Sequence, residues 1–242
     1  MLKNIFKILA IFIIGGIGGI FADQILWPYF VEKPLFYQYR LEQSPVYLTE
    51  RKEIIIQENV ALKNAIEKVE KVVIGIKTIK KDKKILEGSG LILTSDGLIV
   101  TLAELVPSGS TFNFFVDGAP HQITGGGQIL KRDLKENLAL IKIEKPNLPT
   151  VSFSNLEKIK LGERVFLIGI VFEKTGFKKI VNEGIVKSLD QDSIETNIFE
   201  KANLAGSPLF DIEGKILGIN KIDPEGKVIT IPISKIKTFA GF

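Results

Sequence analysis

Short apolar runs separated by glycine-rich, Asp-Gly and Glu-Gly turns make up most of the chain after Val72. Typical runs are GLIVTL at 97–102 and LALIKI at 138–143. No helix-length segment separates them, so the pattern predicts about a dozen antiparallel strands in an all-β barrel or sandwich, not a parallel sheet. The last residues, 233–242, are expected to form a short helix.

A different period precedes the strands. Apolar residues recur at helical spacing in the segment ENVALKNAIEKVEKVV, namely Ala61, Leu62, Ala65, Ile66 and Val69. This spacing predicts a short amphipathic helix over 58–70. The preceding residues, 28–57, hold three prolines and several aromatic residues without a clear period. They are interpreted as a juxtamembrane linker.

The N-terminus carries the longest apolar run. Residues Ile8–Ala22 are uncharged, and the neighbouring apolar residues extend the run to about 20 residues, the length that crosses a bilayer. We therefore predict a transmembrane signal anchor over 5–27. Lysines precede this span and acidic residues follow it, so residues 1–4 are expected in the cytoplasm and the main domain outside. A cleaved signal peptide ending near Ala22 and a buried core helix are the alternatives.

The composition of the chain restricts the possible site chemistry more than it restricts the possible folds. Hydrophobic residues make up 45% and charged residues 25%, as in ordinary globular proteins, and a net charge of +4 gives little support for a nucleic-acid partner. The chain has no Cys, which excludes thiolate metal sites and disulfides. The single histidine, His121, excludes multi-histidine metal sites and is expected to be an ordinary strand residue. No cofactor or metal is expected.

Five short motifs occur in a fixed order. They are GSGLILTSDGLIVT at 88–101, NLALIKI at 137–143, LGERVFLIG at 161–169, EGIVKS at 183–188 and IETNIFEKANLAGSPLFDIEGKILGIN at 194–220. Together they resemble the protease domain of the HtrA/DegP family of trypsin-like serine proteases, from about Ala61 to Phe239. The resemblance covers the protease domain only. The sequence ends where that domain normally finishes, so no PDZ domain is expected.

The resemblance implies a fold. Members of the family have the chymotrypsin fold, two antiparallel six-stranded β-barrels with the active site in the cleft between them. On this chain the trypsin-like peptidase domain is expected at 58–242. The first barrel is expected over 72–149 and the second over 151–242.

The resemblance also places the catalytic positions. Glu104 stands where the family has its histidine, Asn137 where it has its aspartate, and Ala205 where it has its serine nucleophile. The oxyanion loop maps to Asn203 and Gly206, with Asn203 in place of a glycine. Alanine has no oxygen with which to attack, and a carboxylate is a far weaker base than imidazole at neutral pH. The catalytic triad is therefore degenerate, with no member intact.

These substitutions predict a catalytically inactive, membrane-anchored pseudoprotease of the cell envelope. Its expected partners are peptides or unfolded envelope proteins, bound in the old cleft. The alternatives are an active envelope serine endopeptidase that uses non-standard residues, and a purely structural envelope protein. Homo-oligomerisation is an expectation of the resemblance alone, because family members often trimerise through this domain.

Four further features receive structural interpretations. Ser207, two residues past the lost serine, is expected to be a packed hydroxyl, and a hydrogen bond between Glu104 and Asn137 is expected to fill the old site. The glycines at 88, 90 and 125–127 are interpreted as turn glycines, since they lack the lysine and the strand-to-helix context of a phosphate loop. The lysines at 80, 81, 83 and 84 are expected on a solvated hairpin tip.

Overall fold

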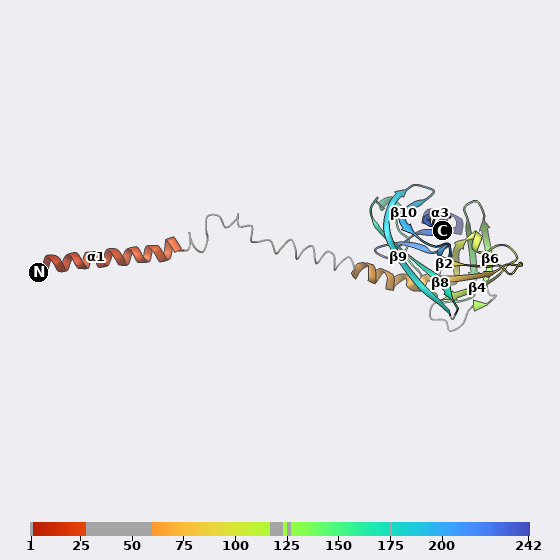
Figure 1. The fold of residues 1–242 in the computed structure, drawn as a ribbon, viewed down its shortest axis with the longest axis horizontal. Coiled ribbons are helices and arrows are strands. Elements are labelled where there is room, and N and C mark those ends of the chain that lie inside the picture. The colour runs from red at the N-terminus through yellow and green to blue at the C-terminus, as the bar shows by residue number, and fades with distance from the viewer. Residues whose placement is uncertain (1, 28–59, 117–122, 125–126, 175) are drawn as a thin grey trace. The chain divides into compact units, whose positions relative to one another are not determined.

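The structure, a computed structural model, describes residues 2–27, 60–116, 123–124, 127–174 and 176–242 (Figure 1). The chain divides into two compact units, Met1–Ile56 and Gln57–Phe242. His121 and the expected linker at 28–57 lie outside the described residues.

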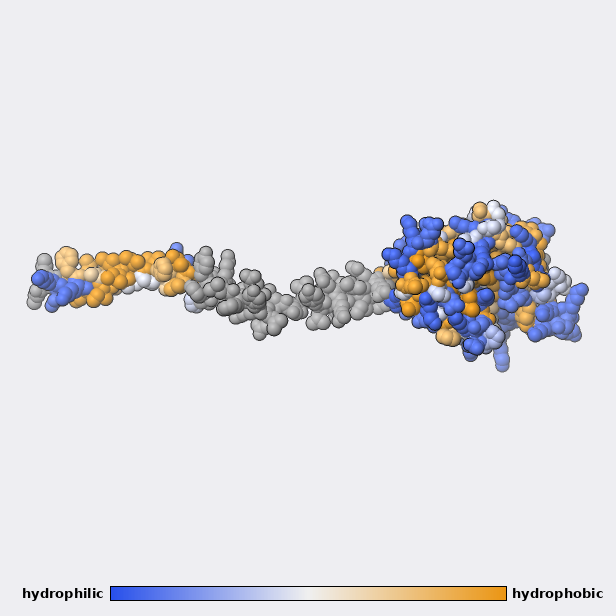
Figure 2. All heavy atoms as spheres, turned by 90° about the horizontal axis from the view of Figure 1, so that it is seen from above, coloured by the Kyte–Doolittle hydropathy of each residue, from blue (hydrophilic) through white to orange (hydrophobic). Residues whose placement is uncertain are grey.

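The first unit holds one helix, α1 (Leu2–Phe21), continued by the π-helix η1 (Ala22–Leu26). Within the stretch Lys3–Leu26, a segment of 18 residues reaches a mean hydropathy of 2.3 and none of that segment is buried, so the helix is long and apolar enough to cross a membrane. Figure 2 shows its surface as hydrophobic along most of its length.

The second unit begins with a helix at 60–69, followed by the 3₁₀ turn η4 (Glu70–Val72). Ala65 and Val69 are buried, and Leu62 and Ile66 pack against the same core. The apolar residues whose spacing predicts the helix therefore form the face that the helix buries.

Seven antiparallel strands form the first sheet, in the order β5-β4-β1-β2-β3-β7-β6. Their bounds are β1 (Val73–Ile79), β2 (Ile85–Ile92), β3 (Leu98–Leu102), β4 (Thr111–Val116), β5 (Ile123–Thr124), β6 (Gly127–Asp133) and β7 (Leu138–Ile143). A short 3₁₀ turn, η5 (Ala103–Leu105), follows β3.

Six antiparallel strands close into a barrel in the second half, in the order β10-β13-β12-β11-β8-β9. Their bounds are β8 (Arg164–Glu173), β9 (Gly176–Leu189), β10 (Ile194–Phe199), β11 (Pro208–Asp211), β12 (Ile216–Ile222) and β13 (Lys227–Pro232). The 3₁₀ turns η6 (Leu156–Lys158) and η7 (Ala202–Leu204) precede β8 and β11. The helix expected at the C-terminus is confirmed as α3 (Ile233–Ala240).

The two-part antiparallel fold is thus confirmed, with one difference in the first half. Among the described residues its end strands β5 and β6 are not hydrogen-bonded to each other, so it is an open seven-stranded sheet instead of a closed six-stranded barrel. The extra strand, β5, has two residues. A strand that short produces no alternation that a sequence pattern could reveal.

A shared hydrophobic core joins the two halves. The first sheet and the barrel each have an inner cluster of their own. A third cluster combines Leu91 and Leu102 of the first sheet with Phe166 and Phe210 of the barrel, whose rings stack at 5.4 Å. Since interiors pack at crystal-like density, this cluster fixes the relative position of the loops that carry the site.

The structure corrects the interpretation of Gly88 and Gly90. Both lie inside strand β2, not in a turn. A Cβ at Gly88 would come within 2.5 Å of Leu105 Cδ1 and 2.7 Å of the Ala205 carbonyl oxygen. Glycine is needed here because η5 and the loop after η7 approach the strand closely.

Candidate functional site

A pocket of about 680 Å³ lies where the two halves meet. It brings together Glu104 from η5 with Asn203 and Ala205 from the η7 loop, three of the positions that the sequence analysis selected. The other residues that line it are Lys80, Ile85, Leu86, Glu87, Leu105 and Ile222. We call this pocket the cleft.

Glu104 and Asn137 are hydrogen-bonded to each other on the first-sheet side. The Asn137 Nδ2 group donates to Glu104 Oε1 at 3.2 Å, and the Glu104 backbone N–H donates to Asn137 Oδ1 at 3.1 Å. The expected Glu–Asn hydrogen bond is therefore confirmed. Asn137 has a φ of 55°, a left-handed conformation that asparagine tolerates better than most residues.

Two side chains hold η5 in place beneath Glu104. The Arg132 guanidinium donates two hydrogen bonds to the Ala103 carbonyl, at 3.1 and 2.9 Å. The Thr78 hydroxyl donates to the Leu105 carbonyl at 2.6 Å. Because the carbonyls on both sides of it are bound, the backbone of Glu104 is fixed at the cleft.

Ala205 is fixed on the barrel side by its backbone. Its carbonyl accepts a hydrogen bond from the Ser89 N–H at 2.9 Å, and its side chain is 7% exposed. The next residue, Gly206, has a φ of 80° and donates its N–H to the Asn220 carbonyl at 2.8 Å. The Gly206 N–H is thus occupied inside the protein.

Ser207 is fully buried in a polar network. Its hydroxyl oxygen accepts from Asn220 Nδ2 at 3.1 Å, and Asn220 Oδ1 accepts from the Thr230 hydroxyl at 2.6 Å. All three residues have an exposed fraction of 0%. The prediction of a packed hydroxyl is confirmed, since the Ser207 oxygen faces Asn220 and not solvent.

The chemistry of the cleft lining is limited. Of the described residues that line it, none carries a hydroxyl, a thiol or an imidazole. Elsewhere in the described part of the chain, no three Asp, Glu or His side chains gather as a metal ion would require. The cleft offers an apolar surface, one ammonium group and two carboxylates.

The sequence analysis missed six of the cleft-lining residues. Lys80 belongs to the lysine run that it treated as a solvated tip, and its half-burial is visible only in the fold. The apolar lining residues Ile85, Leu86, Leu105 and Ile222 have no signal in the sequence that separates them from the other strand residues. Asn137 belongs to the site through Glu104, although it does not line the cleft itself.

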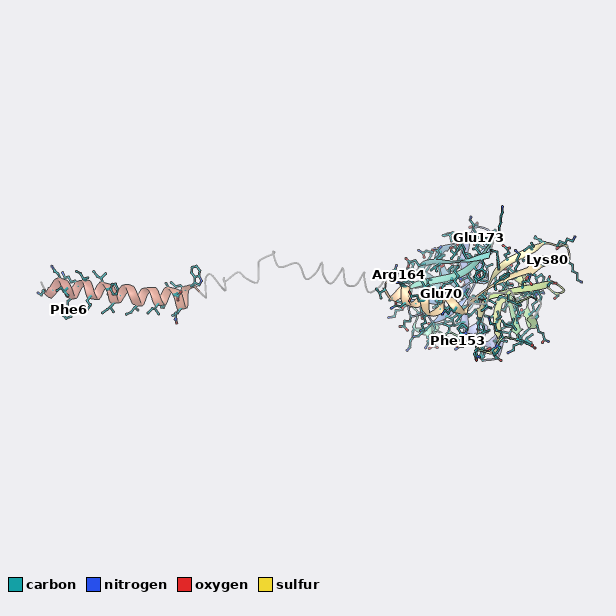
Figure 3. All side chains as sticks on the ribbon, turned by 90° about the horizontal axis from the view of Figure 1, so that it is seen from below. Phe6, Glu70, Lys80, Phe153, Arg164 and Glu173 are labelled. Atoms are coloured by element: carbon teal, nitrogen blue, oxygen red, sulfur yellow. The ribbon has the colours of Figure 1, made fainter. Side chains whose placement is uncertain are left out.

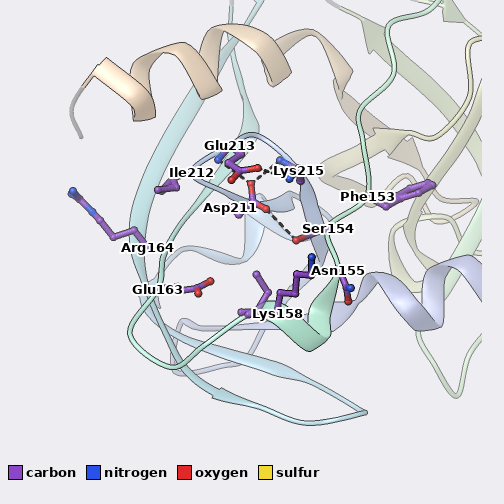
Figure 4. Close-up of a pocket in the computed structure, with 11 residues that line it drawn as sticks. Phe153, Ser154, Asn155, Lys158, Glu163, Arg164, Asp211, Ile212, Glu213 and Lys215 are labelled. Atoms are coloured by element: carbon purple, nitrogen blue, oxygen red, sulfur yellow. Dashed lines mark hydrogen bonds and ion pairs between the residues drawn. The ribbon is translucent and has the colours of Figure 1, made fainter. Parts of the chain in front are cut away.

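A second pocket, of about 490 Å³, lies beside η6 and the β11–β12 turn (Figure 4). Two contacts join residues of its lining: Ser154 donates to Asp211 at 3.1 Å, and Lys215 pairs with Glu213. Its lining includes none of the mapped catalytic positions. We therefore take the cleft as the candidate functional site.

Comparison with known proteins shows the family of the chain. The trypsin-like peptidase domain family matches residues 88–219, more than half of the chain. "Serine protease HTRA1A" of Danio rerio is 30% identical over 175 residues, which are 66% of this chain and 35% of that protein. "Probable periplasmic serine endoprotease DegP-like" of Pseudomonas putida is 33% identical over 142 residues, 55% of this chain and 28% of that protein.

Solved structures with the same fold include "HtrA-type protease AlgW with tripeptide". That structure superposes with a TM-score of 0.63 at 22% identity, over 72% of this chain and 60% of the other. The chain spans about a third of the length of the curated relatives it matches.

Proposed function

The chain belongs to the trypsin-like peptidase domain family, and on that premise we propose that it is a non-catalytic member that binds polypeptide segments in its cleft. The observation that carries the proposal is the composition of the cleft. Glu104, Asn203 and Ala205 meet there, and no described lining residue supplies a hydroxyl nucleophile or an imidazole base.

The chemistry of acyl transfer supports inactivity. Peptide hydrolysis by this family requires a nucleophilic oxygen, a base that accepts its proton, and a group that orients the base. Ala205 lacks the oxygen, Glu104 replaces the imidazole, and Asn137 binds Glu104 instead of orienting a histidine. Loss of single members of such a triad costs on the order of 10⁴ to 10⁶ in kcat, and the members act as a unit.

Ser207 offers no replacement nucleophile. Its side chain has an exposed fraction of 0%, and its oxygen accepts a hydrogen bond from Asn220 Nδ2. A peptide carbonyl would need to come within about 3.5 Å of that oxygen, which requires opening the barrel.

The shape and lining of the cleft support a binding role. Apolar side chains line it from both halves, from β2 and η5 on one side and from β12 on the other. Apolar clefts with a few polar groups are the usual form of ligand sites. The relatives named above are proteases, whose substrates are polypeptides, so the ligand class that fits the fold is a polypeptide segment.

The apolar helix and the periplasmic relative together support a location. We propose that Lys3–Leu26 is an uncleaved membrane span with a cytoplasmic N-terminus, and that the peptidase-like domain lies outside the cytoplasm. External protease added to spheroplasts should then degrade residues 60–242. Protection of that region would reverse the orientation.

The test of the chemistry uses the full chain in detergent with a serine-directed fluorophosphonate probe. No labelling is expected, while an active serine protease in the same detergent is labelled. Labelling of the parent that disappears in Ser207→Ala would overturn the proposal by identifying a relocated nucleophile. The binding role is tested in parallel with fluorescent peptides, as described below.

A further inference from the structure

The tip of the β1–β2 hairpin carries four lysines in an ordered turn. They are Lys80, Lys81, Lys83 and Lys84, interrupted only by Asp82. The Lys83 N–H donates to the Lys80 carbonyl, and the Lys80 N–H to the Lys84 carbonyl, both at 2.9 Å. These bonds order the backbone from which the four side chains project, and Figure 3 shows Lys80 where β1 ends.

These lysines differ from many others on the domain. Several lysines of the sheets are paired with carboxylates, as in Lys77–Glu87 at 2.9 Å and Lys227–Glu195 at 2.8 Å. Within the part of the chain that the structure describes, no ion pair is formed by any of the four lysines at the hairpin tip. The tip thus presents a net positive charge that the protein does not neutralise.

Lys80 is the member of this group that reaches the site. Lys80 lines the cleft and is half-buried, whereas the other three are exposed. The aliphatic part of a lysine side chain packs against apolar neighbours while its ammonium group stays accessible to a ligand. Its surroundings in the cleft include the apolar side chains of Ile85, Leu105 and Ile222.

Neither carboxylate of the cleft forms an ion pair with Lys80 among the described residues. Glu87 is paired with Lys77, and Glu104, which keeps its negative charge, is hydrogen-bonded to Asn137 on the first-sheet side. The next charged residues along the chain from Lys80 are the three other lysines of the tip and Asp82. A ligand that enters the cleft at the hairpin end therefore meets an apolar surface with a cationic rim.

We propose that the cleft selects polypeptide segments in which an acidic residue lies next to apolar residues. The apolar side chains pack against Ile85, Leu105 and Ile222, and the carboxylate binds the Lys80 ammonium, with the other lysines of the tip adding a longer-range attraction. This inference rests on the proposed binding function and specifies its ligand.

An anionic bilayer is the other partner that such a cluster could attract. The observations favour a peptide, because the distinguishing lysine lines a concave pocket together with apolar side chains, and a flat membrane surface does not reach into a pocket. The three exposed lysines could attract a peptide or a membrane equally well. The position of Lys80 in the pocket favours the peptide.

The experiment measures binding to the full chain in neutral detergent by fluorescence anisotropy. Three labelled peptides of equal length share one apolar core and differ in their flanking residues, which are Glu, Gln or Lys. The Glu peptide is expected to bind most tightly, and Lys80→Gln should weaken it about fivefold while leaving the Gln peptide unchanged. Raising the ionic strength from about 0.05 M to about 0.3 M should reduce the preference for Glu.

Lys158→Gln is the matched control, because Lys158 is exposed and lines the pocket of Figure 4 instead of the cleft. It should leave the preference unchanged. Equal binding of the three peptides, or an equal loss in both variants, would overturn the charge selection and leave peptide binding intact. Binding of none of the peptides would overturn both proposals. Competition of the Glu peptide by anionic lipid vesicles, lost in Lys80→Gln, would assign the cleft to lipid instead.

Discussion

Asn220 and Asn137 hold the two sides of the cleft with the same side-chain amide, in opposite environments. Asn220 is completely buried, donates to Ser207 and accepts from Thr230. Asn137 is half-buried, and its partner Glu104 is exposed to solvent. A buried amide that loses its partners is costly, whereas water replaces the partners of an exposed one at little cost.

The difference between the two sides shows which features of the cleft are required for the protein to fold. On the barrel side the fold uses the Ala205 carbonyl and the Gly206 N–H, which any residue compatible with the backbone provides. The side chain at 205 takes no part in these hydrogen bonds, so alanine is tolerated there. The cleft therefore keeps its backbone geometry without a hydroxyl or an imidazole among its described lining side chains.

The largest expected effect is on activity, from restoring all the reactive groups at once. The changes are Glu104→His, Asn137→Asp, Asn203→Gly and Ala205→Ser. Because the side chain at 137 already accepts the backbone N–H of residue 104, an aspartate there is placed to orient a histidine at 104. We expect hydrolysis of a fluorogenic peptide that the parent lacks, at a rate about 10²-fold or more below an intact enzyme, because small misplacements are expensive.

The matched control for this restoration omits Ala205→Ser and keeps the other three changes. It should be inactive, as should each single change, because the groups act as a unit. A folded variant with all four changes that neither cleaves nor binds peptide would contradict the binding role of the cleft and leave the structural alternative.

The next effect is on stability, from Gly206→Ala. A Cβ at Gly206 would lie 2.2 Å from the Ser89 carbonyl oxygen, at a φ of 80°. We expect a loss of about 3 kcal/mol or more in the free energy of unfolding, measured by urea titration of the full chain in detergent. Gly162→Ala is the control, since its φ is 84° with nothing within 4 Å of the added Cβ, and it should cost about 1 kcal/mol. Equal losses would show that the close approach to Ser89 is not rigid.

Asn220→Ala tests the buried network directly. It leaves the Ser207 and Thr230 hydroxyls without their partner in a site that excludes water. The expected loss is about 2–4 kcal/mol in the same titration. Asn203→Ala, in the neighbouring loop and half-buried at the cleft, should change stability by less than about 0.5 kcal/mol. A similar loss in both would mean that the network is not what fixes the barrel side.

Asn137→Gly should have a smaller effect, within about 0.5 kcal/mol of the parent. The lost hydrogen bonds are exposed to water, and glycine suits the φ of 55°. Asn137→Ala should cost about 1 kcal/mol more, because alanine is strained there. Asn147, with a φ of 59° and an exposed side chain, provides the same pair of substitutions without the contact to Glu104. A larger loss at 137 than at 147 would show that the Glu104 contact contributes to folding.

The smallest expected effect is a change of stability with pH, which separates the titratable side chain of Asp190 from the neutral network around Asn220. Backbone N–H groups of Asp192 and then Ser193, at 2.8 and 2.7 Å, lower the pKa of Asp190 below its ordinary 3.8. A lowered folded-state pKa stabilises the protein above the unfolded pKa, and this contribution is lost as the pH falls through the folded pKa. The difference in Tm between parent and Asp190→Asn should therefore shrink as the pH falls below about 3.8. The loss in Asn220→Ala should not change, because its network has no titratable group.

Much of the architecture could be read from local patterns. The apolar spacing at Ala65 and Val69 corresponds to a buried helix face, and runs such as LALIKI became strands. The positions Glu104, Asn203 and Ala205 meet in one pocket, as the motif order implies. The two-residue strand β5 and the placement of Gly88 inside β2 could not be read, because neither depends on a local period.

The sequence by itself determined the elements and the identities of the groups at the site, because periodicity and residue type are local properties. It showed that residue 205 has no hydroxyl and that residue 104 has no imidazole. Only the tertiary structure decided which groups share an environment. It buried Ser207 against Asn220, joined Asn137 to Glu104, and placed Lys80 among the residues that line the cleft. The burial of a side chain and its hydrogen-bond partners depend on residues far apart in the chain, so they cannot be read from the local sequence pattern.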